Sequence, residues 1–214
     1  MRTRIRSIVA AAGVVALLLA SPGVAMGGTK DKQPVFDFES GEQITGAFAM
    51  VDRSADGVTS KIRTSVNGGH AFTVWYVIFN NPSACAGGAC GEDDIFNPDG
   101  TFNVGQIEAT RLSVVWGNSG GVSNPAGRIS LDGGLAVGEV PGGPGQVLIG
   151  TTEDNAIFDL GVTTGLETAD AEIHLVIQDH GAAHADPELL EQQTSSFMGA
   201  CNPDCFDVQF SVHK

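Results

Sequence analysis

Apolar and polar residues alternate with a period of two along much of this chain, and long segments with the helical period are missing. Residues 206–213 read FDVQFSVH, and residues 171–178 read AEIHLVIQ. Successive side chains of a strand point to opposite faces of a sheet, so each segment predicts a half-buried strand. The chain is therefore expected to fold as sheet.

A hairpin is predicted around a glycine turn. Residues 58–66 alternate in the same way, and Asn67, Gly68 and Gly69 follow them. Asn and Gly adopt positive φ at little cost, which favours a tight turn before the next apolar run. That run, AFTVWYVIF at 71–79, is apolar on both faces and predicts a central strand covered on two sides.

Further short strands and one helix complete the predicted architecture. Asp186 is a suitable cap, Pro187 fits the first helical position, and residues 188–193 favour a helix. With turn residues every 8 to 12 positions, the pattern predicts an all-β fold, an antiparallel β-sandwich or barrel with one short helix. The other predicted strands are 35–38, 44–51, 112–116, 128–131, 135–140 and 146–149.

The N-terminus has the pattern of an export signal. Three arginines, at positions 2, 4 and 6, precede a run of 13 apolar or small residues at 8–20. A membrane span needs about 20 such residues, so the run predicts a cleavable signal peptide. We expect residues 1–25 to be the signal and 26–214 to be one exported domain, secreted or held in the cell envelope.

Acidic side chains outnumber basic ones by 25 to 11, a formal charge of −14. A negative surface repels nucleic acid phosphates and anionic lipids, so neither is an expected partner. No later segment is apolar for long enough to span a bilayer, so no membrane insertion is expected after signal cleavage. The expected partner is an extracellular protein or carbohydrate, and its identity is unknown.

Four cysteines, Cys85, Cys90, Cys201 and Cys205, form two closely spaced pairs. The spacings also suit a four-thiolate zinc site, but an exported chain with an even number of cysteines is expected to oxidise. Three pairings are open, and Gly87 and Gly88 slightly favour pairing within each local motif.

Three histidines lie within residues 174–184. His174 and Glu172 share a strand face, and His180 and His184 follow Asp179. Imidazoles beside carboxylates suit zinc or copper, so His174, Asp179 and His180 are the candidate metal ligands. The favoured interpretation is that no cofactor binds, because the spacing demands no coordination geometry.

Residues 165–183, GLETADAEIHLVIQDHGAA, resemble a widespread type of uncharacterised secreted bacterial protein with an AEIHLV…HG signature. More distantly the segment is similar to the CHRD domain. It departs from the CHRD pattern at two positions. Glu172 stands where that pattern has its first histidine, and Leu175 stands where it has glycine. The resemblance implies an extracellular β domain and supplies no catalytic residue.

Residues 117–121, GNSGG, fit the G-x-S-x-G pattern and resemble a chymotrypsin-like serine motif, which makes Ser119 a candidate nucleophile. His70 and then Asp93 or Asp94 precede it in the order of such a triad. No helix can begin after Ser119, and a glycine-rich turn between strands explains the motif better.

The sequence contains two further candidate binding sites. Glu92, Asp93 and Asp94 could hold calcium weakly, although the following loop fails the EF-hand pattern. The second candidate is a platform for stacking a sugar, formed by the aromatic residues Trp75, Tyr76 and Trp116. These residues lie in apolar strands, which favours packing in the core instead.

No coherent catalytic set emerges, so we expect a non-enzymatic binding or structural module. The alternatives are a metal-binding protein or metalloenzyme that uses the histidines at 174–184, and a serine hydrolase at Ser119.

Overall fold

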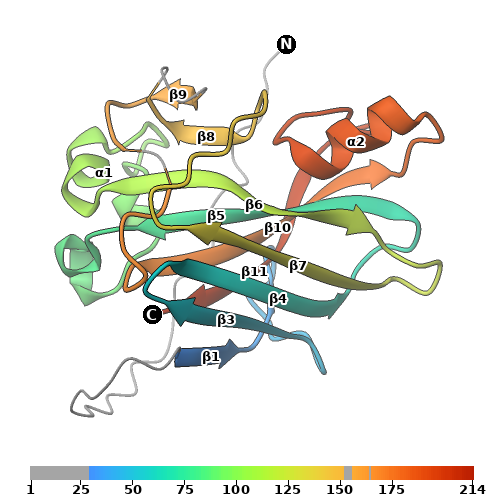
Figure 1. Cartoon of the computed structure of the whole chain (residues 1–214), viewed down its shortest axis with the longest axis horizontal. Coiled ribbons are helices and arrows are strands. Elements are labelled where there is room, and N and C mark those ends of the chain that lie inside the picture. Colours follow the sequence, from blue (N-terminus) through green and yellow to red (C-terminus); the bar gives the residue numbers. More distant parts are fainter. Residues whose placement is uncertain (1–28, 152–155, 164) are drawn as a thin grey trace.

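The computed structural model describes residues 29–151, 156–163 and 165–214 (Figure 1). The predicted signal peptide at 1–25 lies outside the described residues. Among the described residues, no helix has the length and apolar character needed to cross a membrane.

Two sheets lie face to face, so the fold is a β-sandwich, and the predicted all-β class is confirmed (Figure 1). The smaller sheet has the strand order β1-β3-β4-β7 and is antiparallel throughout. Its strands are β1 (Thr29–Gln33), β3 (Phe48–Ser54), β4 (Gly57–Ser65) and β7 (Arg128–Ala136).

The larger sheet has the order β2-β11-β10-β5-β6-β8-β9 and is antiparallel except for its last pair. Its strands are β2 (Phe36–Asp37), β5 (His70–Phe79), β6 (Leu112–Val122), β8 (Val147–Gly150), β9 (Ala156–Asp159), β10 (Glu172–Ala182) and β11 (Phe206–His213).

The central strand β5 is buried on both faces, as its sequence predicts. One set of its side chains, which includes Phe72 and Tyr76, packs between the sheets. The other set, which includes Trp75 and Phe79, packs against a second core on the outer face of the larger sheet. Trp75 and Tyr76 are 1% and 0% exposed, so they are core residues and cannot form a sugar-stacking platform.

The predicted hairpin at 58–79 is wrong, because its two strands belong to different sheets. Both edges of β4 are occupied, by β3 and β7. The residues after β4 instead lie against the connection that leads into β7, where Val66 N donates to Gly127 O at 2.7 Å. The chain therefore crosses between sheets at 66–69, where the sequence predicts a reversal within one sheet.

The sequence also predicts that strands end at two glycine-rich segments, residues 117–121 and residues 132–134. Both predictions are wrong. β6 runs through residues 117–121, and β7 runs through Gly133 and Gly134. The two strands lie in opposite sheets and approach closely, since a Cβ on Gly133 would lie 2.3 Å from Gly117 O. Glycine here permits close contact between sheets instead of a turn.

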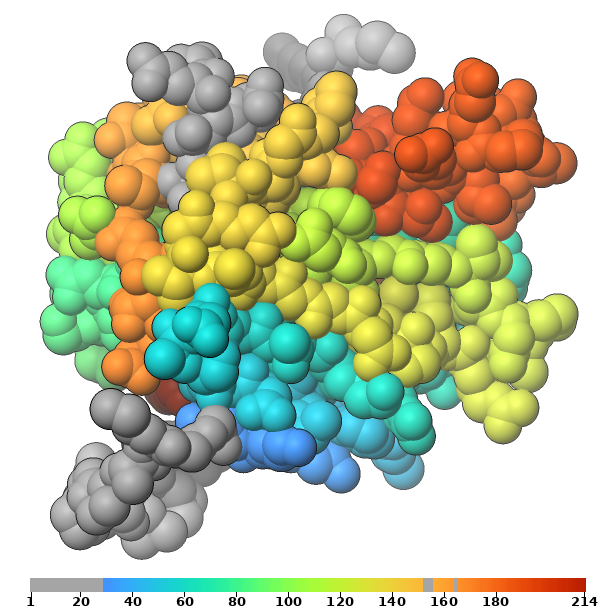
Figure 2. All heavy atoms as spheres, in the orientation of Figure 1, coloured from blue at the N-terminus to red at the C-terminus, as the bar shows by residue number. Residues whose placement is uncertain are grey.

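The predicted helix is confirmed as α2 (Pro187–Ser195), with Asp186 Oδ1 accepting hydrogen bonds from Glu188 N and Leu189 N. The sequence missed α1 (Val104–Thr110), which is capped by Asn103. Figure 2 shows α2 and the adjoining chain at one corner of the molecule, away from the smaller sheet. Three short 3-10 turns lie between β5 and α1, at Pro82–Ala84, Ala86–Gly88 and Glu92–Asp94.

All four cysteines form disulfides, and both pairings are local. Cys85 pairs with Cys90 and Cys201 with Cys205, with Cα–Cα distances of 4.9 and 5.2 Å. No free thiol remains in the described chain, so the alternative four-thiolate zinc site is not formed. The slightly favoured local connectivity is the one present.

Candidate functional site

An open pocket of about 230 Å³ lies at one end of the space between the two sheets. Ends of β-sandwiches and mouths of barrels are common positions for ligands, because the strands hold the lining side chains rigidly. The pocket combines two carboxylates, two amides and three apolar side chains: Asp37, Val66, Asn67, Phe72, Asp179, Val208 and Gln209. None of these described lining residues is Lys or Arg.

Asp179 is the most firmly held carboxylate of the pocket. Its oxygens accept hydrogen bonds from Gly181 N at 2.7 Å, Asn67 Nδ2 at 3.1 Å and His70 Nδ1 at 3.0 Å. The pairing of β10 with β5 is irregular between Asp179 and Ala182, which allows the Gly181 amide to turn back towards the carboxylate. Three donors on three chain positions fix the carboxylate in one orientation.

His70 lies beside the pocket, where its Nδ1 donates to Asp179. Its side chain is 31% exposed, and the ring stacks on Phe72 with centroids 6.4 Å apart. A carboxylate that holds the Nδ1 proton of an imidazole is the arrangement that orients a catalytic histidine. Within the described chain, however, His70 Nε2 has no hydrogen-bonded serine, threonine or cysteine that could act as a nucleophile.

Asp37 supplies the second carboxylate of the pocket. Its Oδ1 accepts hydrogen bonds from Ser40 N and Ser40 Oγ, both at 2.8 Å. These two bonds lower the pKa of the Asp37 carboxyl below its ordinary value, so the group is ionised at neutral pH. No hydrogen bond to Asp37 Oδ2 is found from the described residues, which leaves that oxygen for a ligand.

Gln209 is held in place by the smaller sheet. Its Oε1 accepts from Thr64 Oγ1, and its Nε2 donates to Ser65 O, each at 2.7 Å. The lining side chains therefore come from the larger sheet and from the connection that follows β4, and β4 of the smaller sheet holds Gln209 in place.

The three predicted metal ligands are not brought together. Asp179 lies at the pocket between the sheets, whereas His174 and His180 lie on the outer face of β10. His174 Nε2 is 2.9 Å from Glu172 Oε1, and His180 Nε2 is 2.8 Å from Thr73 Oγ1. Alternation along the strand explains the separation, because Asp179 and its neighbour His180 must point to opposite faces.

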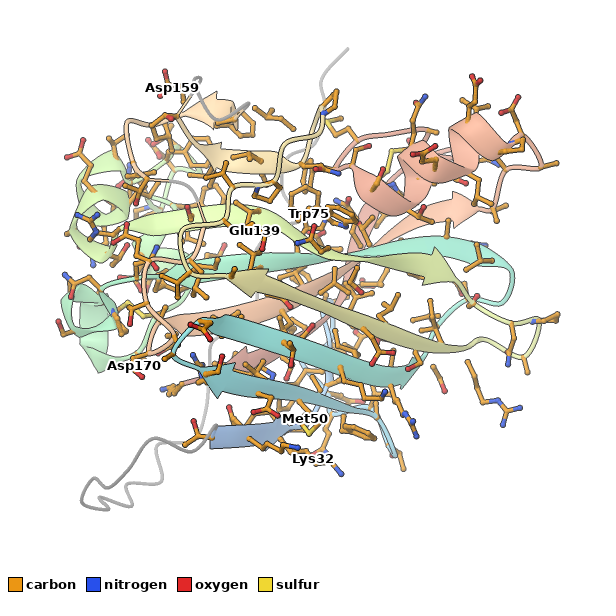
Figure 3. All side chains as sticks on the ribbon, viewed as in Figure 1. Lys32, Met50, Trp75, Glu139, Asp159 and Asp170 are labelled. Carbon is orange, nitrogen blue, oxygen red and sulfur yellow. A yellow bond between two sulfur atoms is a disulfide. The ribbon has the colours of Figure 1, made fainter. Side chains whose placement is uncertain are left out.

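His180 is completely buried, and burial lowers its pKa to about 4. The neutral ring donates from Nδ1 to Gly199 O at 3.2 Å and accepts at Nε2 from Thr73 Oγ1. Thr73 Oγ1 in turn accepts from Trp75 Nε1 at 2.9 Å. Figure 3 places Trp75 on the side of the sheet that faces the α2 region, where its ring contacts Phe197 edge to face.

His184 and Asp94, two other residues that the sequence analysis names, make hydrogen bonds that stabilise the fold. The backbone N of His184 donates to Gln193 Oε1 at 2.9 Å, which ties the loop before α2 to the helix. Asp94 is buried and accepts from Ala86 N, Gly91 N and Gln106 Nε2. These bonds close the loop around Cys85 and Cys90, so Asp94 is already satisfied without calcium.

Ser119 is 2% exposed, and its hydroxyl has no hydrogen-bond partner among the described residues. A Cβ on Gly133 would lie 2.7 Å from Ser119 Cβ, which places this serine against the opposite sheet. His70, the predicted partner of Ser119, pairs with Asp179 instead. A buried serine without a base cannot attack a substrate.

Asp207 carries a raised pKa beside an unpaired amide oxygen. Gln178 Nε2 donates to Asp207 Oδ1 at 3.3 Å, while the buried Gln178 Oε1 has no partner in the described chain. Although the Asp207 residue keeps some exposed area, burial of its carboxyl raises its pKa to about 7. Protonation gives the Asp207 carboxyl an O–H donor that the carboxylate lacks.

We therefore expect Asp207→Asn to stabilise the protein at pH 8. The unfolded carboxyl ionises from about pH 4 and the folded one only near pH 7, so this group lowers stability as the pH rises between those values. An amide removes that cost, so the free energy of unfolding should rise at pH 8. We expect a rise of about 1 kcal/mol, which is smaller than the full pKa shift implies because Asp207 is partly exposed to solvent. The gain should shrink towards pH 4.

Urea unfolding at pH 4 and pH 8 measures this difference. Asp204→Asn, an exposed position in the preceding loop, is the control and should change stability little at either pH. An equal effect of Asp207→Asn at both pH values would contradict the raised pKa.

Sequence reasoning missed most of the pocket. Asp37 and Gln209 lie far apart in the chain and belong to no local motif, and the sequence predicts only a turn at Asn67. Comparison with known proteins finds no matching family model, no matching curated protein and no matching solved structure. The resemblance of residues 165–183 to secreted bacterial proteins and the CHRD domain therefore stays a prediction.

Proposed function

We propose that this chain is an exported, non-enzymatic binding module whose pocket between the sheets binds a small organic cation. The observation that carries the proposal is the lining of the pocket, with two carboxylates, apolar walls and no Lys or Arg among the described lining residues. The formal charge of −14 adds a field that attracts cations.

The two carboxylates have different roles in this proposal. Asp179 is held by three donors and provides a fixed negative charge. Asp37 is ionised and has Oδ2 available, so it is the acceptor for an ammonium group of the ligand. Apolar parts of the ligand would contact Val66, Phe72 and Val208.

Two features support export and binding over catalysis. The two local disulfides agree with an extracytoplasmic protein. The ordered Asp179–His70 pair has no nucleophile bonded to it within the described chain, so the pocket holds charge without a reactive group.

The test is a titration with benzylammonium, followed by NMR chemical shifts, with benzyl alcohol as the neutral probe of similar shape. We expect saturable shifts at the pocket with benzylammonium and much weaker binding of benzyl alcohol. Asp37→Asn should weaken benzylammonium binding about fivefold to tenfold, the scale of one charge-assisted contact. Asp56→Asn, which removes the same charge at an exposed turn, should leave the affinity within about twofold.

Equal affinity for the two probes would overturn the proposed ligand class. So would unchanged benzylammonium binding by Asp37→Asn in a folded variant.

A further inference from the structure

His180 and the Cys201–Cys205 disulfide form a compact cluster on the outer face of the larger sheet. One potential ligand atom from each residue lies within 4.8 Å of the other two, and the described residues contain no other such group of histidine, cysteine and acidic side chains. Cys205 Sγ lies 3.2 Å from His180 Nδ1. The cluster lies apart from the pocket between the sheets, so it is independent of the function proposed above.

The loop that carries the cysteines is docked onto β10 by backbone hydrogen bonds. Asn202 N donates to His180 O at 2.8 Å, and Ala182 N donates to Asn202 O at 3.2 Å. Gly181 permits this contact, because a Cβ there would lie 1.8 Å from Asn202 O. These bonds do not involve the disulfide, so they can hold both sulfurs near His180 after the disulfide is reduced.

The imidazole of His180 is oriented as a metal-binding histidine would be. Its Nε2 is 2.8 Å from Thr73 Oγ1, which also accepts a hydrogen bond from Trp75 Nε1. A hydrogen-bond partner on one ring nitrogen fixes the plane of the ring, as the outer partner of a metal-binding histidine does. The other nitrogen, Nδ1, lies 3.2 Å from both Cys205 Sγ and Gly199 O. It can bind a metal once its proton, which Gly199 O accepts in the oxidised protein, has moved to Nε2.

We propose that reduction of Cys201–Cys205 creates a binding site for one Cu(I) ion, held by the two cysteine sulfurs and His180 Nδ1. A dithiol reductant supplies the two electrons and two protons that convert the disulfide into two thiols, and is itself oxidised to a cyclic disulfide. Cu(I) then replaces both thiol protons, which pass to solvent, and the single imidazole proton moves from Nδ1 to Nε2, where Thr73 Oγ1 accepts it.

The donor set favours Cu(I) over other metals. Thiolates are soft ligands that select Cu(I) or zinc, and structural zinc sites normally have four protein ligands. The cluster offers three donors and no carboxylate. Pro203 and Asp204, between the cysteines, are exposed, so an ion can reach the half-buried sulfurs from solvent.

The second disulfide supplies a matched control. Cys85 and Cys90 form an equally local pair, but the neighbouring group is Pro82 O, which lies 3.9 Å from Cys90 Sγ, and no histidine belongs to that cluster. The Cys85→Ser, Cys90→Ser double variant therefore removes two thiols and should leave the Cu(I) site intact.

The experiment is an anaerobic Cu(I) titration of the full chain, reduced with a dithiol and then desalted, against a chromophoric Cu(I) chelator. We expect one tightly bound equivalent in the reduced protein and in the Cys85→Ser, Cys90→Ser variant. We expect none at that affinity in the oxidised protein or in Cys201→Ser, Cys205→Ser. His180→Gln should bind Cu(I) at least tenfold more weakly.

X-ray absorption of the reduced, Cu(I)-loaded wild type tests the ligands even if His180→Gln fails to fold. Two sulfurs and one nitrogen around copper are expected. A shell of sulfur alone, loss of the site in Cys85→Ser, Cys90→Ser, or no tight Cu(I) binding by the reduced protein would overturn the proposal.

Discussion

Gly133→Ala is expected to lower the free energy of unfolding by about 3 kcal/mol, at the upper end of the cost of an overpacked core. The new Cβ would lie 2.3 Å from Gly117 O and 2.7 Å from Ser119 Cβ. The first of these is a backbone atom of the opposite sheet, so relief requires the sheets to move apart. Urea unfolding followed by circular dichroism measures the change.

Gly142→Ala is the matched control for this prediction. A Cβ at Gly142 meets nothing within 4 Å, and its backbone does not need the left-handed region. Its effect should stay within about 0.5 kcal/mol. If Gly133→Ala is equally mild, the close approach of β6 and β7 is not a constraint on the fold.

Arg53→Met should lower the free energy of unfolding by about 4 kcal/mol, since hydrogen bonds to a charged group contribute about 1.5–3 kcal/mol each. Arg53 is 7% exposed and lies on β3 of the smaller sheet. Its guanidinium donates to three carbonyl oxygens outside that sheet, those of Ala169, Ala171 and His213. Methionine would leave buried carbonyls without donors.

Arg63→Met provides the comparison, because Arg63 lies on the neighbouring strand β4 and is exposed. It should change stability by less than about 0.5 kcal/mol. Arg53→Lys should recover only part of the loss, since one ammonium cannot reproduce the planar fork of donors. If Arg53→Met is as stable as the wild type, the three hydrogen bonds to carbonyl oxygens make no net contribution to the free energy of unfolding.

The contrast between β4 and β5 shows why strand positions were easier to predict than strand pairing. Alternation at 58–66 and the apolar run at 71–79 are local patterns, and both strands are present. Pairing depends on which edges other strands occupy, and β3 and β7 occupy both edges of β4. A turn sequence between two strands does not carry that information.

Local sequence patterns also do not determine which side chains of the candidate site lie close together. The sequence predicts one metal site that contains His174, Asp179 and His180. Adjacent residues of a strand face opposite sides, and His174 lies six residues from His180, about 20 Å along β10. The groups that do approach His180, Thr73 and Cys205, come from other parts of the chain.

The residue pattern by itself determined that this chain forms sheet, that residues 71–79 are buried on both faces, and that a capped helix follows Asp186. These properties depend on neighbours a few residues away. Only the tertiary structure decided which strands share a sheet, that Asp37 and Asp179 line one pocket, and that His180 lies against a disulfide. Such contacts join residues far apart in the chain, and packing of the whole molecule selects them.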